Sequence, residues 1–178
     1  MIKLHIIKNQ ASPHWDSLVR IYHESFPIDE QRPVESIVHL IEHDERFVAY
    51  TLTNDKDHLI GLLTTWEFTN FIYIEHFAIN PEVRSRGYGS EAMSSFIKGQ
   101  EKPIVLEADP PTDDITRRRI RFYERQGLTL YDFPYQQPAY TEDSHPVELR
   151  LMGTLDTQTT PLTLVSKTLH REVYGDKK

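Results

Sequence analysis

One stretch decides both the fold and the site: Ile74-Glu75-His76-Phe77-Ala78-Ile79-Asn80-Pro81-Glu82-Val83-Arg84-Ser85-Arg86-Gly87-Tyr88-Gly89-Ser90. Its apolar first half predicts a strand, and its second half turns into a helix expected over 88–98. A helix N-terminus leaves backbone N–H groups unpaired and attracts anions. Gly87 and Gly89 allow close backbone approach to a ligand, and Arg84 and Arg86 offer donors suited to phosphate. This stretch therefore predicts an anion site rather than an ordinary strand-to-helix connection.

The rest of the chain alternates strands and helices without an internal repeat or a domain boundary. Strands are expected over 2–7, 47–53, 59–68, 71–79, 103–108, 128–131 and 147–152. Helices are expected from Ser12-Pro13 to about Phe26, from Pro33, over 88–98, from Thr112-Asp113-Asp114 to before Gly127, and from Thr160-Pro161. The segment 133–140 is expected to be a loop. This order predicts an α+β fold with one mixed, mainly antiparallel sheet flanked by helices.

Composition limits the classes of function. The chain carries 27 acidic and 20 basic residues, a net charge of −7, which argues against nucleic-acid binding and mildly favours cationic partners. No apolar run approaches about 18 residues, so we expect no membrane span. The segment 1–7 lacks a signal-peptide cleavage site, and the absence of cysteine fits a cytoplasmic protein.

Two motifs carry a resemblance to a known family. Arg84-Ser85-Arg86-Gly87-Tyr88-Gly89 resembles the Arg/Gln-x-x-Gly-x-Gly/Ala loop of the GNAT acetyltransferases, and Phe122-Tyr123-Glu124-Arg125-Gln126-Gly127-Leu128 resembles their Phe-Tyr-x-x-x-Gly-Phe segment. Where the family often carries Asn and Ala ahead of the second motif, this chain has Thr116 and Arg119. The resemblance implies a GNAT-like domain over 1–153, with 154–178 as a C-terminal helical extension of the same domain.

The resemblance also implies acetyl-CoA as co-substrate and an acetyl transfer to a primary amine of a small molecule. In the family, the glycine loop binds the pyrophosphate of CoA, and backbone N–H groups near the end of a splayed strand bind the pantetheine and thioester. Carried over, the residues that bind the co-substrate are Phe77, Ala78, Ile79, Arg84, Ser85, Arg86, Gly87, Tyr88, Gly89 and Ser90.

Acetyl transfer needs a base for the amine and an acid for the departing thiolate. Glu75 interrupts an apolar strand, so we expect desolvation to raise its pKa and to make it the base. His76 is the alternative, and both side chains reach one ligand only if the strand bulges. Tyr123 matches the family tyrosine near the CoA sulfur, which implies the role of general acid.

The acceptor is less specified. The loop between the first two helices and the loop before the last strand should line its pocket, with Glu30, Tyr135, Tyr140 and Asp143 as candidates. The arginines at 117–119, 121 and 125 are expected to form a solvated face, unless one of them meets the 3′-phosphate of CoA. We expect a monomer or a homodimer.

Two other functions compete with this interpretation. His39-Leu40-Ile41-Glu42-His43 spells the His-x-x-Glu-His signature of a zinc peptidase, but these polar side chains fall opposite the apolar face of their helix, so we expect no metal. A non-catalytic GNAT-like domain that senses acyl-CoA would retain the glycine loop. Such a domain would not need Glu75 or Tyr123.

Overall fold

The computed structural model describes residues 1–175. The helices are α1 (Trp15–Ser25), α2 (Val34–His43), α3 (Tyr88–Lys98), α4 (Asp114–Arg125) and α5 (Leu162–Thr168), with short 3₁₀ helices η1 (Ile28–Glu30) and η2 (Pro81–Val83) and a π-helical turn η3 (Leu169–Val173). The strands are β1 (Lys3–Ile6), β2 (Phe47–Thr53), β3 (Leu59–Glu67), β4 (Ile72–Ile79), β5 (Ile104–Ala108), β6 (Thr129–Leu130), β7 (Tyr135–Gln137) and β8 (Val147–Gly153).

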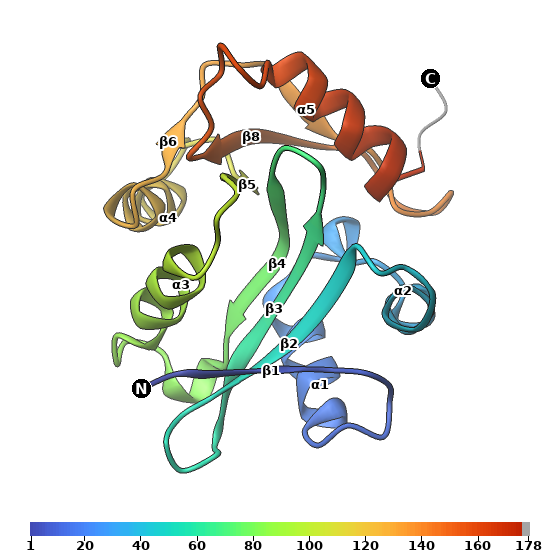
Figure 1. Cartoon of the computed structure of the whole chain (residues 1–178), viewed down its shortest axis with the longest axis vertical. Coiled ribbons are helices and arrows are strands. Elements are labelled where there is room, and N and C mark those ends of the chain that lie inside the picture. Colours follow the sequence, from blue (N-terminus) through green and yellow to red (C-terminus); the bar gives the residue numbers. More distant parts are fainter. Residues whose placement is uncertain (176–178) are drawn as a thin grey trace.

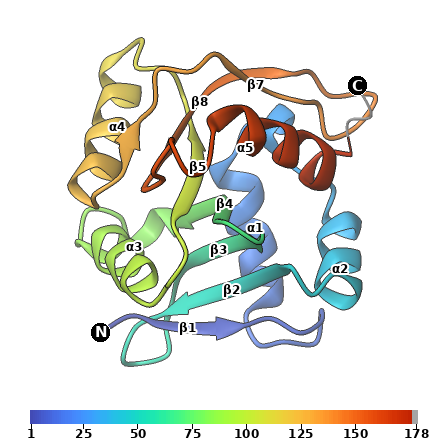
Figure 2. The same cartoon turned by 45° about the horizontal axis from the view of Figure 1, so that its top comes forward.

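The strands form one sheet in the order β1-β2-β3-β4-β5-β8-β6 (Figure 1), with β7 paired to the first residues of β8 (Figure 2). Only β4 and β5 run parallel, and all other neighbours are antiparallel. This confirms the expected α+β class and its mixed, mainly antiparallel sheet. No helix among residues 1–175 is long and apolar enough to cross a membrane.

Helices cover both faces of the sheet, α1 and α2 on one side and α3 and α4 on the other (Figure 2). On the first face α1, α2 and α5 pack Ile21, Ile37 and Val165 into one buried cluster. On the second face α3 and α4 pack Phe96 and Ile120 into another. The C-terminal helix α5 thus shares the core of the α1 face. Burial of such apolar side chains is the main favourable term in folding.

Two local expectations were wrong. Helix α1 begins at Trp15 because the chain before it makes successive turns and His14 takes a left-handed conformation with φ 68°. The segment 133–140 contains β7, which pairs with β8 even though Pro134 and Pro138 flank it. The expected cap of α4 is confirmed, because Asp113 accepts from the N–H of Thr116 at 2.8 Å.

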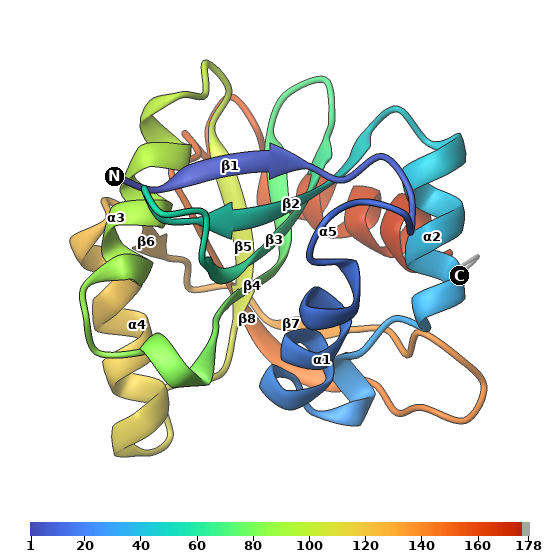
Figure 3. The same cartoon turned by 90° about the horizontal axis from the view of Figure 1, so that it is seen from below.

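Two irregularities in β4 position the site. Pairing with β5 ends at Ile74–Leu106, while β4 continues to Ile79, so the two parallel strands separate. The register with β3 also shifts, because Thr64 faces His76 whereas Thr65 faces Ile74. Glu75 is the extra residue of this β-bulge. Figure 3 shows α1 and α4 on opposite sides of the separating strands.

Candidate active site

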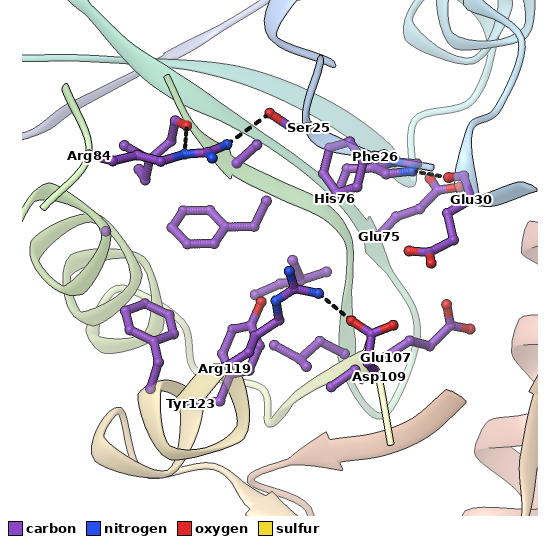
Figure 4. A pocket seen from close by; sticks show the side chains of 18 of the residues that line it. Ser25, Phe26, Glu30, Glu75, His76, Arg84, Glu107, Asp109, Arg119 and Tyr123 are labelled. Carbon is purple, nitrogen blue, oxygen red and sulfur yellow. Dashed lines mark hydrogen bonds and ion pairs between the residues drawn. The ribbon is translucent and has the colours of Figure 1, made fainter. Parts of the chain in front are cut away.

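A cavity of about 760 Å³ lies where β4 and β5 separate. It extends from the loop before α3 to the loop between α1 and α2, and α4 forms one wall (Figure 4). Residues of both predicted motifs and of the bulge line it, among them Glu30, Glu75, His76, Phe77, Ala78, Ile79, Arg84, Ser85, Gly87, Tyr88, Gly89, Ser90, Thr116, Arg119 and Tyr123. A single concave site therefore holds groups that are far apart in the chain, such as Glu30 and Tyr123, which are 93 positions apart.

The outer half of β4 presents backbone donors to this cavity. The N–H of His76 donates to Thr64 Oγ1 at 3.1 Å and the N–H of Asn80 donates to the Ile60 carbonyl at 2.7 Å, so both point toward β3. Successive N–H groups of a strand alternate in direction. Those of Phe77 and Ile79 therefore point away from β3, into the gap left by β5.

The glycine loop supplies a helix N-terminus at the same edge. Ser85 and Gly87 adopt positive φ values of 64° and 82°, and Gly87 directly precedes α3. Arg84 reaches back along the cavity, where its Nε donates to the Ile79 carbonyl at 3.1 Å. Arg86 is exposed and lies outside the cavity lining, so only one of the two predicted arginines faces the cavity.

One side of α4 faces the cavity, at the spacing of successive helical turns: Thr116, Arg119 and Tyr123. Burial raises the pKa of the Tyr123 hydroxyl to about 12, so the group carries its proton at neutral pH. Arg119 forms an ion pair with Asp109 at the end of β5. The other four arginines of the helix, at 117, 118, 121 and 125, are exposed and do not line the cavity.

Glu75 does not have the raised pKa that the sequence predicted. Its carboxylate is 1% exposed and accepts from Arg32 Nε at 3.1 Å, Arg32 Nη2 at 2.8 Å, Tyr140 Oη at 2.7 Å and Trp66 Nε1 at 2.8 Å. Burial by itself would raise the pKa of Glu75, but the positive charge of Arg32 and these hydrogen bonds lower it below its ordinary value. The expected direction was wrong because the sequence did not reveal Arg32 as a partner.

The bulge brings His76 to the same face of β4 as Glu75. From the sequence, both side chains are expected to reach one ligand only if the strand bulges. His76 Nε2 lies 2.9 Å from the Glu30 carbonyl and Nδ1 lies 3.4 Å from Thr64 Oγ1. Burial lowers the pKa of the imidazole, which keeps the ring neutral. His76 thereby ties the α1–α2 loop to β4.

Carboxylates gather at the end of the cavity away from the glycine loop. Glu107 accepts from Tyr73 at 2.9 Å, from Tyr174 at 2.7 Å and from Tyr135, and burial raises its pKa to about 7. Glu30 and Asp109 line the same end. Among the predicted acceptor residues, Tyr135 and Tyr140 are thus bonded to buried carboxylates, while Asp143 is exposed and outside this cavity.

Sequence reasoning missed Arg32, Trp66 and Glu107. Glu107 carries the same signal that singled out Glu75, a lone carboxylate in an apolar strand, here β5. Arg32 and Trp66 carry no such signal, because an arginine in a loop and a tryptophan in a strand are ordinary. Their role follows only from their contact with Glu75.

The possible zinc motif lies elsewhere, on α2. The rings of His39 and His43 stack at 4.4 Å between centroids, and His43 Nδ1 is 3.0 Å from the His39 carbonyl. Within residues 1–175, no group of three or more metal-ligating side chains is assembled.

Comparison with known proteins agrees with this architecture. The model of the acetyltransferase (GNAT) family matches residues 15–128, which include β4, the glycine loop and α4. A solved structure from Bacteroides thetaiotaomicron, described as a candidate acetyltransferase of the GNAT family, is 33% identical and superposes with a TM-score of 0.90 over 97% of this chain and 98% of its own.

Two further similarities are more distant. YjbC of Bacillus subtilis strain 168, named as a candidate acetyltransferase, is 30% identical over 105 residues, and the match spans 58% of this chain and about half, 52%, of that protein. A spermidine N-acetyltransferase from Vibrio cholerae, solved with CoA and spermine, is 13% identical with a TM-score of 0.63 over 88% of this chain and 96% of its own. At that identity the second likeness concerns the fold alone.

Proposed function

The chain belongs to the GNAT acetyltransferase family, and from this we propose that it transfers an acetyl group from acetyl-CoA to a primary amine of a small molecule. One observation carries the proposal. The cavity joins the N-terminus of α3, backbone donors at a strand separation, a protonated tyrosine and a carboxylate-rich end in one continuous space.

The half of the cavity beside α3 suits the co-substrate. We assign the pyrophosphate to the backbone N–H groups and side chains of 84–90, because a helix N-terminus and Arg84 favour anions there. The segment Phe77–Ile79 would receive the pantetheine arm and the thioester. Its two N–H groups in the gap are placed to donate to the oxygen that becomes negative when the amine adds to the carbonyl.

The reaction forms a C–N bond and breaks the C–S bond of the thioester. The ammonium proton must go to a base, and the departing thiolate must gain a proton. Tyr123 is our candidate for the second transfer, since it is protonated and lines the cavity. The role of Glu75 as the base stays a prediction, and the four donors on its carboxylate favour a role in holding the site in shape.

The other half of the cavity suits a cationic acceptor. Glu30, Glu107 and Asp109 attract an ammonium group, and the overall charge of −7 favours its approach. The fold likeness to a spermidine acetyltransferase is compatible with a small amine. We place the protein in the cytoplasm, as its lack of cysteine suggests, and expect a monomer or a homodimer.

The test is turnover. The protein is incubated with acetyl-CoA and butylamine, 1,4-diaminobutane or spermidine, and released thiol is measured, a readout that a cysteine-free protein does not disturb. We expect thiol release that depends on at least one amine. A protein that binds acetyl-CoA calorimetrically but releases no thiol with any of them would instead be the non-catalytic acyl-CoA sensor.

A further inference from the structure

The side chain of Glu30 lies at the carboxylate-rich end of the cavity. Glu30 ends η1 in the α1–α2 loop, and its carboxylate points into the cavity on the side of Glu107 and Asp109 (Figure 4). This wall stands across the cavity from Tyr123 on α4. An amine between the two would have one group to receive its proton and another to protonate the thiolate.

The turn that carries Glu30 is held from two sides. Its carbonyl lies 2.9 Å from His76 Nε2 on β4, and the carbonyl of the preceding Asp29 accepts from Gln137 Nε2 on β7 at 3.2 Å. The N–H of His145 also donates to Asp29 Oδ1 at 2.9 Å. The backbone that carries the Glu30 carboxylate is therefore held in place by two strands before a substrate binds, which limits where that carboxylate can lie.

Glu30 differs from Glu75 and Glu107, the two glutamates on the strands of the cavity, in what its carboxylate contacts. Within residues 1–175 no side chain or backbone N–H donates to it, whereas Glu75 accepts from Arg32, Tyr140 and Trp66 and Glu107 accepts from three tyrosines. A carboxylate whose oxygens already accept such hydrogen bonds has fewer free lone pairs with which to take a proton directly from a substrate. Glu30 keeps its oxygens available.

The surroundings of Glu30 also give it a suitable basicity. Burial raises its pKa to about 7, the negative charges of Asp109 and Asp29 add to this rise, and Arg119 opposes it. A base is most effective when its pKa is near the working pH. The titratable or charged groups around it come from its own turn, β4, β5 and α4: Asp29, Glu75, His76, Glu107, Asp109 and Arg119.

We propose that Glu30 is the catalytic base that accepts the ammonium proton of the acceptor, leaving the nitrogen lone pair to form the C–N bond. Tyr123 gives its proton to the thiolate and regains one as the nitrogen of the new amide loses its second N–H proton. Glu30 returns its proton to solvent after release of the products. The proposal rests on the acetyl transfer proposed above. It assigns Glu75 to positioning, through Arg32 and Tyr140.

The experiment compares Glu30→Gln with Glu35→Gln, an exposed glutamate at the start of α2 outside the cavity. With the fastest of butylamine, 1,4-diaminobutane and spermidine, Glu30→Gln should lower kcat by about 10²-fold or more at pH 7. The rise of kcat/KM with pH near 7 should disappear. Acetyl-CoA affinity by calorimetry should change by less than about twofold, and Glu35→Gln should behave as the unchanged protein.

Two further measurements separate the possible outcomes. Formate added to Glu30→Ala should restore part of the rate, because a small carboxylate can replace the missing base, whereas formate should not help Glu75→Ala. If Glu30→Gln keeps its rate and pH profile while the unchanged protein acetylates amines, the assignment of Glu30 is overturned and the proposed function stands. If the unchanged protein releases no thiol with any amine, the proposed function itself fails.

Discussion

Arg32 neutralises the buried carboxylate of Glu75, and replacing it tests how this site is built. The side chains of Arg32 and Glu75 are 11% and 1% exposed, and two hydrogen bonds of 3.1 and 2.8 Å join them. Arg32 Nη2 also donates to the Val173 carbonyl at 2.7 Å, which ties the C-terminal turn to the site. In Arg32→Met the stem remains of similar bulk, but the positive charge and three hydrogen bonds are lost.

The expected loss of stability in Arg32→Met follows from the unpaired charge of Glu75. Removing one partner of a buried ion pair typically costs about 3–5 kcal/mol of unfolding free energy. Glu75 can limit this cost by taking a proton, which at pH 7 requires about 3.4 kcal/mol for a group of ordinary pKa 4.5 and about 0.7 kcal/mol at pH 5. The loss in Arg32→Met should therefore shrink by roughly 2–3 kcal/mol between pH 7 and pH 5.

The contribution of Glu75 to the free energy of unfolding changes with pH in opposite directions in the unchanged protein and in Arg32→Met. In the unchanged protein the lowered pKa of Glu75 gives stability that is present above 4.5 and is lost as the pH falls through the folded-state pKa. In Arg32→Met the pKa should lie above 4.5, so stability is greatest at low pH and declines as the pH rises. Urea unfolding at pH 5, 6 and 7 measures the decline in Arg32→Met, whereas Glu75 should cause no loss of stability in the unchanged protein over this range.

Two controls complete the assay. Arg46→Met removes ion pairs to Asp44 and Glu172 in which Arg46 is 43% exposed, and it should cost less than about 1 kcal/mol. Arg32→Met with Glu75→Gln removes both charges and should be more stable than Arg32→Met alone at pH 7. If Arg32→Met loses less than about 1 kcal/mol at pH 7, or the loss does not depend on pH, Glu75 is not held as described.

Three further outcomes are expected. Gly87→Ala places a side chain at φ 82°, which costs about 1 kcal/mol, so the loop should leave this conformation and acetyl-CoA should bind roughly fivefold more weakly by calorimetry. Gly99→Ala should bind acetyl-CoA normally, and equal affinities of the two variants would remove the loop from the site. Tyr123→Phe should fold and lower turnover by about 10- to 10³-fold, with a smaller loss for a donor whose thiol is more acidic, and an unchanged rate would exclude Tyr123 as the acid. Glu107 has a pKa raised to about 7, so it favours the folded state below 4.5 and loses this contribution as the pH rises through 7. The melting temperature should therefore fall less between pH 5 and pH 8 for Glu107→Gln than for the unchanged protein. The same fall in both proteins would contradict the buried environment of Glu107.

Local patterns in the sequence were sufficient for most of the fold. The periods of apolar residues and the turn signals predicted the order of helices and strands. The capping of α4 by Asp113 could be predicted because a cap is a hydrogen bond between residues close together in the chain. The glycine loop was readable for the same reason. Its left-handed Gly87 and the helix that follows depend on neighbours in the chain.

The charges and partners of the site were decided only by the tertiary structure. Glu75 meets Arg32 across 43 positions of the chain and Tyr140 across 65, and these contacts reverse the pKa direction expected from burial. Glu30 contacts the β4 histidine only because the loop folds back over the bulge. Electrostatic energies depend on distances in space, which the local sequence does not encode. The sequence therefore determined the scaffold and the glycine loop, and the tertiary structure decided which carboxylate is free to accept a proton.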